Sequence, residues 1–131
     1  MYEIKKTPWG YKLKFEGFIH QEEMANWVKD SETNLSNDLR GSFNVFVDMR
    51  QLKPLPDLAQ EEMQKGQKLY KGKGMKRSVV VVDSATTKMQ FQRIAKQTGI
   101  YQWERYVDAS SNPDWEKVAL DWINQGIDPD K

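Results

Sequence analysis

The side chains able to do chemistry in this 131-residue chain are few, and they form no catalytic motif. The chain has no cysteine, which excludes disulfides, thiolate metal sites and a cysteine nucleophile. His20 is the single histidine and nothing near it resembles a nucleophile, so a histidine metal cage and a Ser-His-Asp triad are implausible. We therefore expect a protein that is not an enzyme, with no catalytic residue, no metal site and no cofactor.

Three carboxylates are expected near strand ends or helix starts along one edge of a sheet, namely Asp48, Asp57 and Asp83. Open α/β sheets bind ligands at the carboxyl ends of their strands, so such a cluster could hold a divalent ion. Acids in these loops are more often caps and turn formers, and we favour that interpretation. Acid–base chemistry by His20, Asp48 and Asp83 is the weakest alternative.

Hydroxyl side chains gather at the predicted start of the helix after the fourth strand, where Ser84, Thr86 and Thr87 lie. Free amides at a helix start can bind an anion, so these three residues are a weak candidate anion site. The glycine-rich run and the lysine of a phosphate loop are missing. The favoured interpretation is that Ser84 is the N-cap of that helix.

A run of cations has no acidic residue within it, and its members are Lys65, Lys68, Lys71, Lys73, Lys76 and Arg77. An anionic partner is one interpretation, but a solvated helix end whose cations complement the helix dipole is favoured. The net charge of the chain is only +1, so we expect no nucleic-acid partner. Acidic residues near the C-terminus could oppose these cations in a homodimer; they are Asp114, Glu116, Asp121, Asp128 and Asp130.

The strands that must position these residues are predicted at residues 1–6, 11–17, 43–48, 78–82 and 103–107. Four consecutive valines at 79–82 predict a central strand that is covered on both faces. Tyr11, Leu13 and Phe15 alternate with charged residues, so their strand has one buried and one wet face. A loop stiffened by prolines is expected at residues 51–56.

Apolar stripes at helical spacing predict four helices, the first at residues 20–30. The second is capped by Asp57, with Gln60 at the capping-box position, and is ended by Gly72 and Gly74. The third is capped by Ser84, ends at Gly99, and is expected to bury Phe91, Ile94, Ala95 and Thr98. The last is capped by Asn112, with Pro113 in its first position.

These elements predict an α/β fold in a single domain, residues 1–125, followed by a loose C-terminal tail, residues 126–131. The order β-β-α-β-α-β-α-β-α indicates a mixed sheet of about five strands, with an N-terminal antiparallel hairpin and mostly parallel later strands. No apolar run is long enough to span a bilayer, and the N-terminus lacks a secretory signal pattern. We therefore expect a cytoplasmic protein without integral membrane contact.

Three segments carry a resemblance to a known family: residues 43–50 with the proline-bearing loop and helix after them, residues 74–83, and residues 96–107. The second is similar to a glycine-led fourth strand, and the third to a helix end with a Thr-Gly pair followed by a last strand. Together they resemble the STAS domain, and most closely its SpoIIAA-like branch of uncharacterised bacterial proteins. The resemblance covers nearly the whole chain and implies a fold related to lipid-binding CRAL-TRIO domains.

The resemblance also implies where a regulatory residue would lie. In the anti-sigma-factor antagonists of this family, a phosphorylatable serine follows an aspartate at the start of the helix after the third strand. Residues 54–60 of this chain contain no serine or threonine, and Asp57 lies roughly where the hydroxyl would be. The fixed charge of Asp57 would imitate a phosphoserine only in part, because phosphate brings nearly two charges and three acceptor oxygens.

Two functions from different classes follow. The first is a non-enzymatic interaction or regulatory module that binds another protein, through a surface formed by Gln51, Leu52, Pro54, Pro56 and Asp57. The alternative is a carrier of a small apolar ligand or lipid in a CRAL-TRIO-like pocket. It rests on the implied kinship and on the many methionines and aromatic residues, which can line adaptable cavities.

Overall fold

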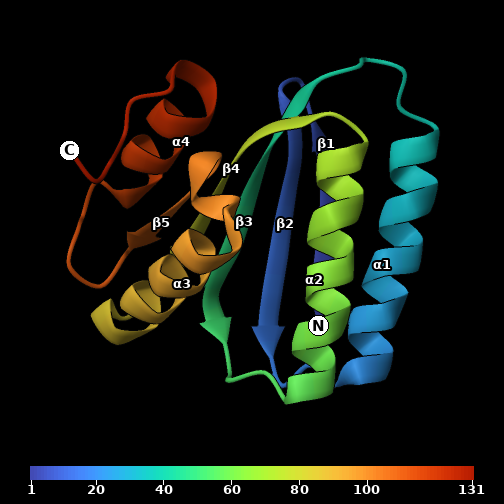
Figure 1. Ribbon diagram of the computed structural model, residues 1–131, viewed down its shortest axis with the longest axis horizontal. Coiled ribbons are helices and arrows are strands. Elements are labelled where there is room, and N and C mark those ends of the chain that lie inside the picture. Colours follow the sequence, from blue (N-terminus) through green and yellow to red (C-terminus); the bar gives the residue numbers. More distant parts are fainter.

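The computed structural model describes the whole chain, residues 1–131, as one five-stranded sheet with four α-helices (Figure 1). Its elements are β1 (Tyr2–Thr7), β2 (Gly10–Gly17), α1 (Gln21–Ser36), β3 (Phe43–Leu52), α2 (Asp57–Gly72), β4 (Met75–Val82), α3 (Ala85–Thr98), a short 3-10 helix η1 (Ile100–Gln102), β5 (Glu104–Asp108) and α4 (Trp115–Gln125). The spatial order is β1-β2-β3-β4-β5. Only β1 and β2 pair antiparallel. The predicted α/β fold with a mixed sheet is confirmed.

The helices cover the two faces of the sheet unequally. α1 and α2 lie side by side over one face, where they and α3 enclose the larger apolar cluster of 19 buried residues (Figure 1). α4 covers the other face alone and packs on a smaller cluster of seven buried residues. The outer part of that second face, on β1 and β2, carries exposed side chains such as Lys5 and Lys12.

The valines of β4 lie at the centre of this arrangement, as the sequence predicts. Val80 and Val82 belong to the cluster under α1, α2 and α3, whereas Val79 and Val81 belong to the cluster under α4. None of the four is more than 3% exposed. β4 is also paired on both edges, with β3 and β5, so it has no wet side.

β3 is longer than predicted, because its end is paired with β2. Gln51 lies opposite Glu16, and Leu52 lies opposite Gly17. The expectation that Gln51 and Leu52 belong to a loop is therefore wrong, and the loop comprises only residues 53–56. The extension buries Met49, whose side chain is 8% exposed, in the larger cluster.

α1 also extends beyond its predicted end. Two buried residues continue its inner stripe, namely Ser31 and Leu35. The Ser31 hydroxyl lies 2.7 Å from the hydroxyl of Tyr70 on α2, which satisfies both polar groups inside the larger cluster. The polar side chain of Ser31 interrupts the apolar pattern in the sequence, so the helix was expected to end at residue 30.

The packing of α3 and the start of α4 differ from expectation. Only Ala95 of α3 is buried, while Ile94 and Thr98 are exposed, because α3 lies over β5 at the edge of the sheet. α4 begins at Trp115, and the side chain of Asn112 accepts a hydrogen bond from the Asp114 amide, at 2.9 Å, before the helix starts. Asn112 thus shapes a turn that precedes the helix instead of capping the helix itself.

The C-terminal tail, residues 126–131, is not loose but contacts β5 and α3. Both carboxylate oxygens of Asp128 accept hydrogen bonds from the Arg105 guanidinium, at 2.9 and 3.1 Å. That guanidinium lies 3.8 Å from the ring centroid of Tyr101 and 4.4 Å from that of Trp122. Arg105 is buried and Asp128 is half-buried, so the tail forms part of the folded unit.

A tight contact between α1 and α2 depends on Gly66. A Cβ atom at this position would lie 2.1 Å from Cζ3 and 2.3 Å from Cη2 of Trp27. The indole cannot move aside easily, because it stacks on Tyr70 and meets the ring of Phe15 edge-on, with centroids 5.7 and 5.1 Å away. Gly66 is therefore required by packing, although glycine is a poor residue for a helix interior.

The substitution Gly66→Ala is expected to destabilise the protein by about 1–3 kcal/mol, the usual cost of overpacking a core. Gly72→Ala is the matched control, because a Cβ there meets nothing within 4 Å. Alanine in that helix should be neutral or stabilising by up to about 1 kcal/mol. Urea denaturation measures both free energies of unfolding. Equal stability of the two variants would contradict the proposed role of the Gly66–Trp27 contact.

Candidate functional site

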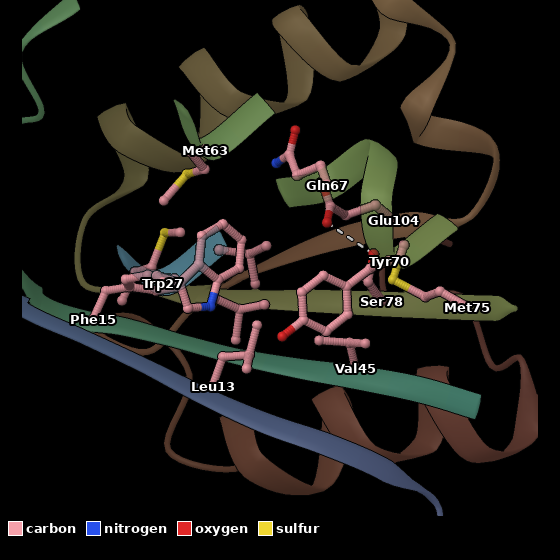
Figure 2. Close-up of a pocket in the computed structure, with 13 residues that line it drawn as sticks. Leu13, Phe15, Trp27, Val45, Met63, Gln67, Tyr70, Met75, Ser78 and Glu104 are labelled. Atoms are coloured by element: carbon pink, nitrogen blue, oxygen red, sulfur yellow. Dashed lines mark hydrogen bonds between the residues drawn. The ribbon is translucent and has the colours of Figure 1, made fainter. Parts of the chain in front are cut away.

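A cavity of about 40 Å³ lies between the sheet and α2 (Figure 2). Ten of its 13 lining residues are hydrophobic, and they include Leu13, Phe15, Trp27, Val45, Met63 and Tyr70. The three polar ones are Gln67, Ser78 and Glu104. A volume of this size corresponds to roughly three water-sized spheres, so it can accommodate a small group but not a lipid chain.

Glu104 places a carboxyl group in the wall of this apolar cavity (Figure 2). The residue is 4% exposed. Its Oε1 accepts a hydrogen bond from the Ser78 hydroxyl at 2.8 Å, and its Oε2 accepts one from the Tyr106 hydroxyl at 2.5 Å. Burial raises the pKa of Glu104, and the two hydrogen bonds oppose that rise only in part. A buried carboxyl with a raised pKa beside a cavity is a candidate functional group.

The pairing of β4 with β5 brings this group together. Ser78 lies directly opposite Glu104, and Val80 lies opposite Tyr106, so alternate residues of both strands point to the α2 side. No role is predicted for Glu104 from the sequence. A signal was present in the sequence, since Glu104 and Tyr106 occupy alternate positions of a short strand expected beside the central one.

Trp27 brings a further polar group to the cavity lining. Its side chain is 2% exposed, and its indole nitrogen Nε1 has no hydrogen-bond partner. In Figure 2 the nitrogen lies on the side of the indole nearer to Tyr70 and Leu13, among the lining residues. A buried donor without a partner is uncommon in folded proteins and calls for a reason.

The surface predicted from the sequence lies at the carboxyl end of β3, at another place in the fold. Pro54, Pro56 and Asp57 are exposed there and adjoin one another, whereas Leu52 is half-buried within β3. Asp57 is the first residue of α2, and Pro56 occupies the N-cap position without a side-chain hydrogen bond. The prediction that Asp57 caps the helix is therefore wrong.

The capping box expected with Asp57 is absent as well. The amide of Gln60 donates to the carbonyl of Pro56, and the Gln60 side chain donates to the carbonyl of Leu55, both at 3.0 Å. These contacts satisfy the start of α2 through the backbone of the proline loop. The carboxylate of Asp57 makes none of the side-chain hydrogen bonds found at this helix start, and it remains exposed.

The three carboxylates expected at one edge of the sheet are not brought together. Asp48 is buried within β3, where Arg50 donates to Oδ1 at 3.0 Å and to Oδ2 at 2.9 Å. Asp57 and Asp83 are exposed. No three histidine, aspartate or glutamate side chains lie close enough to share a metal ion, and that includes the combination with His20.

Ser84 has the capping role predicted for it. Its Oγ accepts a hydrogen bond from the Thr87 amide at 3.0 Å and lies 2.7 Å from the Thr87 hydroxyl. Thr86 is exposed and Thr87 is half-buried. Because the Thr87 amide is engaged by Ser84, fewer free donors remain for an anion, and the anion site stays a prediction.

Three members of the cation run make internal contacts. The Lys65 ammonium donates to Oε1 of Glu62 at 2.8 Å. The Lys71 ammonium lies 4.5 Å from the ring centroid of Trp103 and donates to the carbonyl of Met75. Arg77 donates to the carbonyl of Ile123 in α4. The remaining lysines of the run are exposed. No helix in the chain is long and apolar enough to cross a membrane.

Comparison with known proteins identifies the fold. No protein-family model matches this chain, and no curated protein matches it. Among solved structures, an uncharacterised DUF3478-family protein from Shewanella loihica with a SpoIIAA-like fold is similar to it, with a TM-score of 0.64 and 17% sequence identity. The similarity covers 94% of this chain and 92% of that one. The predicted SpoIIAA-like fold is thereby confirmed, and a likeness at this identity carries no information on activity.

The raised pKa of Glu104 has a consequence for stability. Above pH 4.5 the unfolded chain releases the proton of Glu104, whereas the folded state keeps it. The contribution of Glu104 to the free energy of unfolding is therefore largest below pH 4.5. It is lost as the pH rises toward the folded-state pKa. We therefore expect Glu104→Gln to gain stability relative to the wild type as the pH rises above 4.5. Urea denaturation across this range measures the difference.

Glu32→Gln, at an exposed position on α1, is the matched control for the change of side chain. Other carboxylates, such as Asp38 and Asp128, have lowered pKa values and also make stability depend on pH. Their contribution is the same in the wild type, Glu104→Gln and Glu32→Gln, so it cancels when the free energies of unfolding are subtracted. A Glu104→Gln difference that stays constant or falls as the pH rises would contradict the raised pKa.

Proposed function

We propose that this chain is a non-enzymatic binding module that contacts another protein through the loop at residues 53–56 and the first turn of α2. The observation that carries this proposal is the exposure of large apolar side chains at that place. Phe18 is 71% exposed just after β2, and Leu58 is 52% exposed in α2. Figure 1 shows the end of β2 and the start of α2 at the same end of the molecule.

The backbone joins these apolar residues into one surface. The amide of Lys53 donates to the carbonyl of Gly17 at 3.1 Å, so the proline loop begins beside the residue that precedes Phe18. Pro54 and Pro56 restrict the backbone of the loop, which lowers the entropy lost when a partner binds. A rigid surface with exposed aromatic and aliphatic anchors is typical of protein interfaces.

Asp57 contributes charge to this surface. It is exposed, and it occupies the region where the resembling anti-sigma-factor antagonists carry a phosphorylatable serine. Without a hydroxyl there, partner binding by this chain would not be switched by phosphorylation at that position. We accordingly propose a module whose surface charge is permanent, acting in the cytoplasm either on another protein or on a second copy of itself.

The double substitution Phe18→Ser with Leu58→Ser is expected to weaken capture of the partner at least tenfold, since hot-spot residues each contribute about 2 kcal/mol or more. Leu39→Ser is the matched control, because Leu39 is 94% exposed but lies in the connection at the other end of the molecule. Quantitative pull-down from cell extract followed by mass spectrometry measures the effect, and Asp57→Lys tests the charge. Identical recovery with all variants would remove this surface from the interaction.

The cavity supports a second candidate function, the binding of a small apolar ligand. The specific observation is that ten of its 13 lining residues are hydrophobic. Its volume of about 40 Å³ lies far below the roughly 300–1,000 Å³ of pockets for drug-sized molecules. A small ligand therefore suits the cavity, whereas a lipid would need α2 to move away from the sheet.

A further inference from the structure

The cavity under α2 has two features that packing alone does not explain. One is the indole N–H of Trp27, which is buried and has no partner. The other is Glu104, a carboxyl in a wall that is otherwise almost entirely apolar. Both groups bear on what the cavity would hold, so the inference drawn from them rests on the second candidate function above.

Trp27 offers a fixed donor. Its ring stacks on Tyr70 at an interplanar angle of 12°, meets Phe15 edge-on, and lies against the backbone of Gly66. These contacts hold the indole in place beside Tyr70, whose hydroxyl already pairs with that of Ser31. A donor held without a partner is costly when it is buried, and the cost disappears when an acceptor atom reaches it.

Glu104 adds an acidic group, and no cation, to the wall of the cavity. Both of its oxygens are engaged by protein hydroxyls, those of Ser78 and Tyr106, so the group is held in place. The 13 lining residues include no lysine and no arginine. An anionic ligand would lose its hydration without gaining a cation, and it would lie beside an acidic group. The chemistry of the wall thus disfavours carboxylates and phosphates.

We propose that the cavity binds a small uncharged molecule with an apolar body and one carbonyl or hydroxyl oxygen, which accepts a hydrogen bond from Nε1–H of Trp27. Anions of the same shape are excluded, because none of the lining residues supplies a cation. The cavity volume of about 40 Å³, which corresponds to roughly three water-sized spheres, limits the ligand to about four non-hydrogen atoms. A ligand of that size binds weakly, because affinity is limited by the number of atoms in contact.

Acetamide and acetate provide a matched pair of probes, since they have nearly the same shape and differ in charge. Each is titrated into ¹⁵N-labelled full-length protein at pH 7, and the indole N–H resonances of the five tryptophans are followed by NMR. Trp27→Phe identifies the Trp27 resonance by its absence. Methyl resonances of Met63 and Met75 report separately on occupation of the cavity.

The expected result is a saturable shift of the Trp27 indole resonance with acetamide, at an affinity at least tenfold higher than with acetate. Glu104→Gln, which is uncharged and keeps the shape of the side chain, is expected to leave that ratio at tenfold or more, because the exclusion of anions comes from a lining without a cation. Shifts of the methionine methyls without a shift of the Trp27 indole would overturn this inference and leave the second candidate function standing. No saturable shift at either reporter would overturn both, and equal affinity for the two probes would overturn the exclusion of anions.

Discussion

β4 carries four consecutive valines, and such a strand is stable only when other elements cover both of its faces and pair with both of its edges. The chain meets this requirement with β3 and β5 at the edges, three helices on one face and α4 on the other. The strands follow one another in sequential order across the sheet, so right-handed crossovers place every connecting helix on the same face. α4 connects no strands, and it is the one helix that is free to cover the opposite face.

This division makes the two faces different in kind. α4 is a single helix with one apolar stripe, and it packs directly on β3, β4 and β5. On the other face, α1 and α2 must pack against each other as well as on the sheet, and the contact of Gly66 with Trp27 satisfies both demands. The cavity lies there, under α2, where large rings and flexible methionines meet around a strand that carries small side chains. Its position is thus a product of the topology.

The parts of the fold that local periodicity determines could be predicted, and the parts that depend on distant partners could not. The valines of β4 and the inner stripe of α2 are repeated patterns, and burial follows them. The end of β3 depends instead on pairing of Gln51 and Leu52 with β2, which no local pattern indicates. Asp57 resembles a cap in sequence, yet the backbone at Pro56 already occupies that position. Glu104 becomes notable only through the β4–β5 register that sets it opposite Ser78.

Folding alone gives little reason for the hydrogen-bonded group around Glu104. Buried polar groups of this kind can often be replaced by apolar side chains of similar volume without loss of stability, so the free energy of folding does not require a carboxyl there. The location of the cavity under α2 also relates the two proposed sites. Met63 and Gln67 of α2 cover the cavity, and Leu58 begins the same helix at the exposed surface. A molecule that shifted α2 on entering the cavity would also shift the surface offered to a partner, so the two binding events would be coupled through one rigid element.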